Sequence, residues 1–188
     1  MIFVGLGNVG DRYDGTLHNT GFLVADKLAA RLSLSFKDAP ALQAFLAEGN
    51  VNGKKILIAK PKTFMNLSGE CVKALTAKFK GETDVLICYD DIDLPLGATR
   101  YRETGSPGTH NGMRNITALC GALPRLRVGI GRPHEQEDLA SFVLKKAGKE
   151  TRETLSAAAE KVTDALLRYL ETGDRGALTR ALNENKPR

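Results

Sequence analysis

Short apolar runs alternate along this chain with stretches in which apolar residues recur at helical spacing. Residues 2–4 (Ile-Phe-Val) form one continuous apolar run, and residues 84–89 and 126–130 contain two more. Runs of this length are typical of strands buried on both faces of a sheet. After the first run, apolar residues recur every three or four positions and predict an amphipathic helix over about residues 19–31. This alternation predicts an α/β fold with a mixed sheet.

A hairpin and several shorter elements complete the pattern. Strands near residues 44–51 and 54–59 flank Asn52-Gly53, a dipeptide typical of tight hairpin turns, and Pro61 should end the second strand. Ser68 is a candidate N-cap for a helix that carries Val72, Leu75 and Phe79 on one face. Later elements are a strand near 98–102, a helix near 113–121, a helix with one apolar stripe (Leu155, Ala158, Val162, Leu166, Tyr169) and a short helix after Gly173. We therefore expect a single α/β domain over residues 1–188, with a mixed, twisted sheet flanked by helices and a helical C-terminal segment.

The composition excludes several classes of protein. No stretch approaches the length of a membrane span, and the N-terminus has no basic or cleavable region of an export signal. Cys71, Cys88 and Cys120 lie far apart in apolar surroundings, so we expect reduced core thiols rather than disulfides or a zinc site. These features predict a cytoplasmic location.

Arginine is concentrated in the second half of the chain. The net charge is only +5, but residues 96–134 contain one acid, Glu103, no lysine and six arginines: Arg100, Arg102, Arg114, Arg125, Arg127 and Arg132. Guanidinium groups suit bidentate contacts to phosphate, so this segment favours phosphate or nucleic-acid binding over a solvated basic face.

A glycine motif near the N-terminus is an apparent dinucleotide-binding signal. Residues 5–10 match G-x-G-x-x-G after a strand. A dinucleotide fold needs a helix directly after the motif and an acid at the end of the next strand. Here the helix is expected only after His18, and Asp26 falls inside it. We therefore expect the glycines to bend the loop so that Asn8 and His18 face one cleft.

Two of the three histidines are each followed by asparagine, in His18-Asn19 and His110-Asn111. A lone histidine in such a loop is usually a solvated turn residue. A third cluster, at residues 64–66 (Phe-Met-Asn), favours a functional site, because histidine is the usual base near neutral pH and asparagine can hold a substrate without competing for the proton.

Three polar sites follow predicted strands, at Asn8, at residues 64–66 and at Asp90. Ligands of open α/β sheets collect at this edge, where a carboxylate can orient His18 as a base. No Gly-x-Ser-x-Gly motif is present, so we expect water as the nucleophile. The carboxamides of Asn8, Asn66 and Asn111 could hold the substrate.

Asp90-Asp91-x-Asp93 also permits a metal hypothesis, because hard cations prefer clustered oxygens. No histidine spacing or further acidic cluster supports it, and Asp93 with Pro95 could simply shape a turn. We expect no metal and no cofactor.

Six segments of the chain form one ordered series of motifs. They are Gly-Leu-Gly-Asn-Val-Gly (5–10), Thr-Leu-His-Asn-Thr-Gly-Phe (16–22), Lys-Pro-Lys-Thr-Phe-Met-Asn-Leu-Ser-Gly (60–69), Asp-Asp-Ile-Asp-Leu-Pro-Leu-Gly (90–97), Thr-His-Asn-Gly-Met-Arg (109–114) and Arg-Leu-Arg-Val-Gly-Ile-Gly-Arg-Pro (125–133). In this order they resemble the motifs of the bacterial-type peptidyl-tRNA hydrolase family. The resemblance implies a monomeric, cofactor-free esterase that cleaves a peptide from the 3′-terminal ribose of tRNA.

The resemblance also implies roles for individual residues. His18 matches the catalytic base, Asp90 the acid that orients it, and Asn8 the residue associated with accepting N-blocked groups. Further matches are to residues that contact the tRNA end or the peptide (Tyr13, Phe64, Asn66, Asn111), that line the cleft (Met65, His110) and that bind tRNA phosphate (Arg102, Arg127).

The chain departs from the family pattern at four positions. Val9 replaces a common proline, and Leu17 replaces a common arginine and so removes one basic contact. Pro107 and Thr109 occupy a loop that is usually rich in glycine. Two alternatives stay open: a non-enzymatic RNA-binding relative of the same fold, and a metal-dependent phosphohydrolase that uses Asp90, Asp91 and Asp93.

Overall fold

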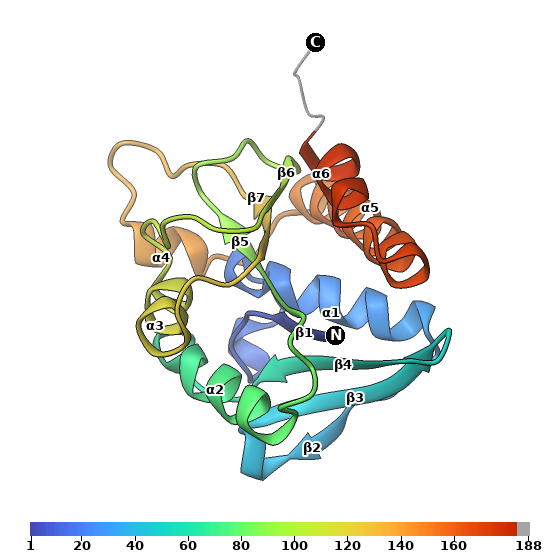
Figure 1. Cartoon of the computed structure of the whole chain (residues 1–188). Coiled ribbons are helices and arrows are strands. Elements are labelled where there is room, and N and C mark those ends of the chain that lie inside the picture. Colours follow the sequence, from blue (N-terminus) through green and yellow to red (C-terminus); the bar gives the residue numbers. More distant parts are fainter. Residues whose placement is uncertain (184–188) are drawn as a thin grey trace.

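A seven-stranded mixed sheet forms the centre of the molecule (Figure 1). The computed structural model describes residues 1–183. The strand order is β2-β3-β4-β1-β5-β7-β6; β4, β1, β5 and β7 are parallel, whereas the outer pairings are antiparallel. The strands are β1 (Ile2–Gly5), β2 (Lys37–Ala39), β3 (Ala44–Val51), β4 (Lys54–Pro61), β5 (Val85–Asp91), β6 (Thr99–Arg102) and β7 (Arg125–Gly129). The predicted mixed α/β fold is confirmed.

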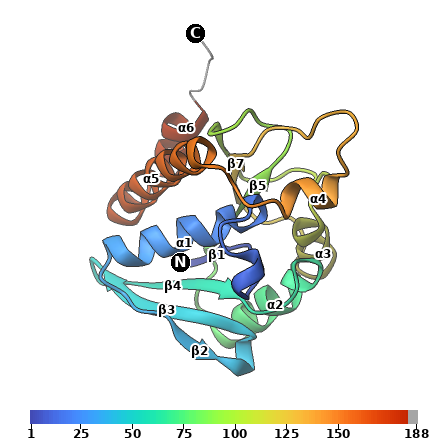
Figure 2. The ribbon, with the colours of Figure 1, turned by 180° about the vertical axis from the view of Figure 1, so that it is seen from behind.

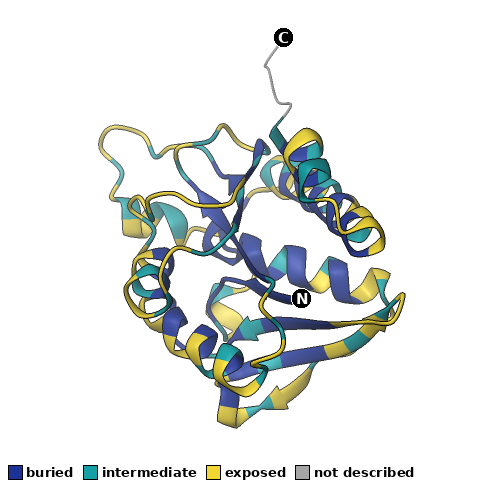
Figure 3. Cartoon of the chain, in the orientation of Figure 1, coloured by how far each residue is buried: buried dark blue, intermediate teal, exposed yellow. Residues whose placement is uncertain are grey.

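Helices cover both faces of this sheet (Figure 2). On one face, α1 (Thr20–Arg31), α5 (Lys149–Thr172) and α6 (Arg175–Asn183) share a core with Phe3 of β1. On the other face, α2 (Ser68–Lys78) and α3 (Asn111–Cys120) pack with Ile2 and Val4. Successive side chains of a strand point to opposite faces, so β1 contributes to both cores. Figure 3 shows the central strands as the most continuously buried part of the chain.

Most predicted elements lie within two residues of their expected bounds. The hairpin and the apolar stripe of α5 are confirmed. Two predictions were wrong at strand ends: β4 continues through Pro61, which pairs with Ala44, and β5 continues through Asp91. Strand β2 and the short helix α4 (Leu139–Val143) were not predicted, because neither is long enough to produce a clear periodicity.

Local side-chain contacts account for two further corrections. Ser68 is the first residue of α2 rather than its cap, since its hydroxyl donates to the carbonyl of Met65 at 2.8 Å. Cys71 and Cys88 are buried as expected, and burial raises the pKa of the Cys71 thiol to about 12. Cys120 is only half-buried, so it is not a core thiol. No helix in residues 1–183 combines the length and apolar character that crossing a membrane requires.

The first turn of α1 lies directly against β1, where Gly21 of the helix meets Gly5 of the strand. A Cβ added to Gly21 would lie 2.4 Å from both the Cys88 carbonyl oxygen and the Leu6 nitrogen. Because these are backbone atoms, a side chain here would push α1 away from the sheet. α1 begins two residues after His18, so this contact also helps to fix the position of that histidine relative to the sheet.

We expect Gly21→Ala to lower the free energy of unfolding by more than about 2 kcal/mol through this overlap. Urea denaturation followed by circular dichroism measures the change. Gly81→Ala is the matched control, because nothing lies within 4 Å of its added Cβ. Equal stability of the two variants would contradict the close packing of α1 on β1.

Candidate functional site

A cleft of about 690 Å³ opens at the carboxyl ends of the parallel strands. Asn8 follows β1, residues 64–66 follow β4, and Asp90 lies at the end of β5. The loop before α3 and helix α4 close the other sides. All the polar sites expected at strand ends therefore meet in one cleft, as predicted.

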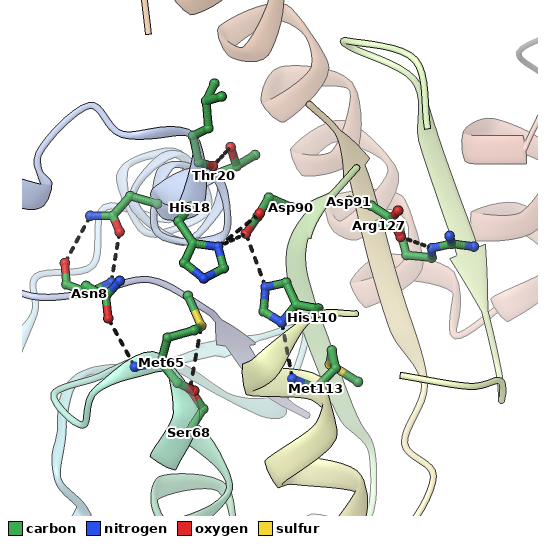
Figure 4. A network of polar contacts seen from close by, with 12 residues as sticks. Asn8, His18, Thr20, Met65, Ser68, Asp90, Asp91, His110, Met113 and Arg127 are labelled. Carbon is green, nitrogen blue, oxygen red and sulfur yellow. Dashed lines mark hydrogen bonds and ion pairs between the residues drawn. The ribbon is translucent and has the colours of Figure 1, made fainter. Parts of the chain in front are cut away.

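Asn8 is held by three hydrogen bonds at the floor of this cleft (Figure 4). Its backbone N–H donates to Asn19 Oδ1 at 2.8 Å, and Asn19 Nδ2 donates to its carbonyl at 3.0 Å. Its own Oδ1 accepts the Met65 N–H at 3.0 Å. The amide nitrogen of Asn8 has no partner among the described residues, so it remains as a donor for the cleft. The oxygen and the nitrogen of the Asn19 side chain thus both bind the backbone of Asn8, a role that the His-Asn pair did not predict.

His18 lies beside Asn8 and is 8% exposed. Its Nδ1 lies 2.9 and 3.0 Å from the two carboxylate oxygens of Asp90. Because an ionised carboxylate only accepts, Nδ1 carries the proton of the neutral ring and Nε2 has a free lone pair. No described residue binds Nε2. The predicted pairing of His18 with Asp90 is therefore present in the structure.

Asp90 also accepts a hydrogen bond from the second histidine. His110 Nε2 lies 3.2 Å from Asp90 Oδ1, and the Met113 N–H donates to His110 Nδ1 at 3.2 Å. The backbone N–H can only donate, so the proton of a neutral His110 is on Nε2 and points at Asp90. His110 thereby caps α3 and binds Asp90 at the same time, two contacts that the sequence did not reveal.

Burial and charge act in opposite directions on this trio. Burial alone would raise the pKa of Asp90, but attraction to His18 and His110 and the hydrogen bonds from both rings hold it well below its ordinary value. Burial lowers the pKa of His18, whereas the negative charge of Asp90 and the hydrogen bond to Asp90 raise this pKa. The net result is a His18 pKa above the ordinary value. Asp90 is therefore ionised at all physiological pH values.

The neighbouring acids do not join this group. Asp91 pairs with Arg127 and accepts the Asp93 N–H at 2.8 Å, whereas Asp93 pairs with Arg132 at 2.7 Å. The three aspartates thus have separate partners, which is evidence against the hypothesis of an aspartate metal cluster. Within residues 1–183, His18, Asp90 and His110 are the side chains close enough together to share an ion.

The arginines of residues 96–134 do not form one patch. Arg114 and Arg127 line the cleft. Arg102 is exposed on β6 and is not part of the cleft wall. Arg125 is 1% exposed and donates to the carbonyls of Leu123 and Ser106, so the expectation that it belongs to a phosphate-binding segment was wrong.

The other expected site residues also line the cleft, but they differ in how far they are exposed to solvent. Met65 is buried, Tyr13 and His110 are half-buried, and Asn66 and Asn111 are exposed. Phe64 is 64% exposed and so presents an unpaired aromatic ring at the rim. Two further parts of the cleft wall were not predicted: Tyr89, whose ring lies 4.7 Å from that of His110, and α4. An N-cap pattern, Asp138 accepting the Ser141 N–H, was the available signal for α4.

Known proteins share this fold and sequence over almost the whole chain. The peptidyl-tRNA hydrolase family model matches residues 2–188. A peptidyl-tRNA hydrolase of Chloroflexus aurantiacus is 44% identical over 190 residues, covering 99% of this chain and 98% of the relative. This chain belongs to the peptidyl-tRNA hydrolase family. A second member, from Roseiflexus sp. (strain RS-1), is 45% identical and covers 95% of this chain and 84% of its own length. The crystal structure of the Acinetobacter baumannii peptidyl-tRNA hydrolase superposes with a TM-score of 0.91 at 32% identity, covering 100% of this chain and 96% of that chain.

Leu17, one of the departures from the hydrolase motifs, has a structural role. Its side chain is buried in the core around α1 and α5, and its N–H donates to the Lys145 carbonyl at 3.1 Å. The residue therefore anchors the turn that carries His18 to the segment after α4. The replacement that was expected to remove one basic contact thus supplies a core contact in this chain.

Replacing Asp90 by Asn should lower the pKa of His18 below its ordinary value, because burial would then act without the opposing negative charge. The pKa is measured by NMR titration of the histidine rings. Asp91→Asn is the matched control, since Asp91 pairs with Arg127 and does not contact His18. A His18 pKa that stays the same in Asp90→Asn would contradict the proposed electrostatic coupling.

Proposed function

We propose that this protein hydrolyses the ester bond between an N-blocked peptide and the 3′-terminal ribose of tRNA, with water activated by His18. The observation that carries the proposal is the His18–Asp90 pair, which leaves Nε2 of a buried histidine unpartnered at the cleft. The names of the relatives indicate the substrate class. The resemblance further implies a single-domain monomer that acts in the cytoplasm without a cofactor.

In the proposed reaction, His18 Nε2 takes a proton from water as the oxygen attacks the ester carbonyl. The negative charge of Asp90 stabilises the imidazolium that forms. When the tetrahedral intermediate collapses, its bond to the ribose oxygen breaks and His18 returns the proton to that oxygen. The products are the peptide, whose new carboxyl group releases its proton to solvent, and a tRNA with its terminal hydroxyl restored.

The free amide nitrogen of Asn8 supports a preference for N-blocked substrates. Its oxygen is already used by the Met65 N–H, so the side chain presents a donor to the cleft. A peptide carbonyl next to the ester can accept from this donor, whereas the ammonium of a free aminoacyl ester cannot. A site that leaves a polar group unpaired with the wrong substrate discriminates strongly.

The tRNA end is proposed to occupy the more exposed part of the cleft. Asn66 and Asn111 offer carboxamides there, and the exposed ring of Phe64 and that of Tyr13 offer stacking surfaces for unpaired bases. Arg127 in the cleft and Arg102 outside it are proposed to contact phosphate. Such contacts position a nucleic acid without selecting its sequence, so the protein should accept many tRNAs.

We expect His18→Ala to lower the hydrolysis of an N-acetylated aminoacyl-tRNA by at least about 100-fold, because the base is lost, while tRNA binding stays nearly intact. Single-turnover hydrolysis and filter binding measure the two properties. His134→Ala is the control, since His134 is exposed and lies outside the cleft wall. Substantial residual turnover in His18→Ala would exclude His18 as the base.

Asn8→Asp should retain the acceptor for Met65 but lose the donor that faces the cleft. We expect kcat/KM for the N-acetylated substrate to fall at least about tenfold. The ratio of kcat/KM for the N-acetylated substrate to kcat/KM for the unblocked substrate should fall as well. The exposed Asn50→Asp gives the same change of charge away from the site. An unchanged ratio would show that Asn8 does not recognise the blocked group.

A further inference from the structure

Three side chains from separate segments meet at Asp90. His18 comes from the turn before α1, Asp90 from β5 and His110 from the residue before α3, and one ligand atom of each lies within 4.8 Å of the others. Most of the surface of all three side chains is buried. All three also line the cleft, so a small ion has a route to them from solvent.

We infer that His18, Asp90 and His110 form a latent inhibitory site for a zinc-type divalent cation. Two imidazole nitrogens and one carboxylate oxygen are a donor set that zinc uses in proteins, with the fourth position left open. Magnesium and calcium prefer oxygen ligands, so the trio selects against them.

The two nitrogen–oxygen distances at Asp90 are close to those between neighbouring ligands of a zinc ion. With ligand bonds of about 2.0–2.2 Å, neighbouring ligand atoms of a tetrahedral site lie about 3.4 Å apart. The two contacts to Asp90 Oδ1 are 2.9 Å from His18 Nδ1 and 3.2 Å from His110 Nε2. The ligand atoms of the three side chains lie within 4.8 Å of one another, so the two rings need to move closer together for zinc to bind. The Asp90 carboxylate also needs to move aside, so that the cation takes the place of the two ring protons that now point at it.

The consequence for activity follows from the two tautomers. The cation takes the lone pairs of His18 Nδ1 and His110 Nε2, atoms that carry protons in the metal-free protein. Each neutral ring then carries its proton on the other nitrogen, so protons are exchanged with solvent without net release. His18 Nε2 becomes an N–H donor and can no longer accept a proton from water. His110 Nδ1 likewise stops accepting the Met113 N–H, so zinc binding also releases the cap of α3.

Zinc binding is independent of the proposed function, but inhibition rests on it. The protein is first treated with EDTA and desalted, and ZnCl₂ is then added in a calorimetric titration. We expect one zinc ion to bind per chain, and CoCl₂ to give the intense visible bands of tetrahedral cobalt. Hydrolysis of N-acetylated aminoacyl-tRNA should fall at least about tenfold at saturating zinc and recover with EDTA, whereas the same concentration of MgCl₂ should not inhibit.

His110→Asn tests the assignment of the ligands. Asparagine is a good N-cap and can still cap α3, but it removes one imidazole, so zinc affinity should fall at least about tenfold. His18→Asn should weaken zinc binding similarly and serves as a second test if the first variant does not fold. His134→Asn, the matched control, should bind zinc as the unaltered protein does.

Unchanged zinc affinity in both ligand variants, or no saturable binding, would overturn the site. Zinc binding that depends on His110 but leaves hydrolysis unchanged would overturn the tautomer mechanism. Failure of the metal-free protein to hydrolyse the ester would contradict the proposed function alone, because calorimetry and the cobalt spectrum would still decide whether the site exists.

Discussion

The buried carboxylate of Asp90 is the constraint on which the site depends. An ionised carboxylate that is 2% exposed is costly unless donors replace the lost water. Asp90 has such donors in His18 and His110, and the geometry of both rings follows from this requirement. Each ring therefore turns one protonated nitrogen toward Asp90. The same hydrogen bonds that make the carboxylate tolerable also determine which nitrogen of His18 is free for chemistry.

Backbone packing determines where these rings lie. Asp90 belongs to β5, which pairs with β1 on one side and β7 on the other, so its position is fixed by two parallel ladders. His18 precedes α1, whose Gly21 lies against the backbone of Leu6 and Cys88. His110 is fixed by capping α3. A strand, a close helix–sheet contact and a helix cap thus bring three distant segments to one point. Two hydrogen bonds with the Asn19 side chain fix the neighbouring Asn8.

Local patterns predicted most of the fold but not its less regular parts. Buried strands were recognisable from continuous apolar runs, as in β1 and β5, and amphipathic helices from apolar residues at helical spacing, as in α5. β2 and α4 are too short for such a pattern. Arginine content indicated a basic segment, yet Arg125 is buried against backbone carbonyls. Charge along a sequence does not reveal which face of a strand each residue occupies unless the pairing register is known.

The sequence by itself determined the alternating elements, the loops at the strand ends and the residue types that can perform acid–base chemistry, because these depend on neighbours along the chain. Through its ordered motifs it also indicated the family. Only the tertiary structure decided that Asn19 clamps Asn8, that His110 both caps α3 and binds Asp90, and that Asp91 pairs with Arg127. These contacts are hydrogen bonds that join separate segments or orient a ring. Their directions depend on how the strands and helices pack. The two similar His-Asn pairs therefore occupy different positions: one ring has a free nitrogen at the cleft, and the other has both nitrogens engaged.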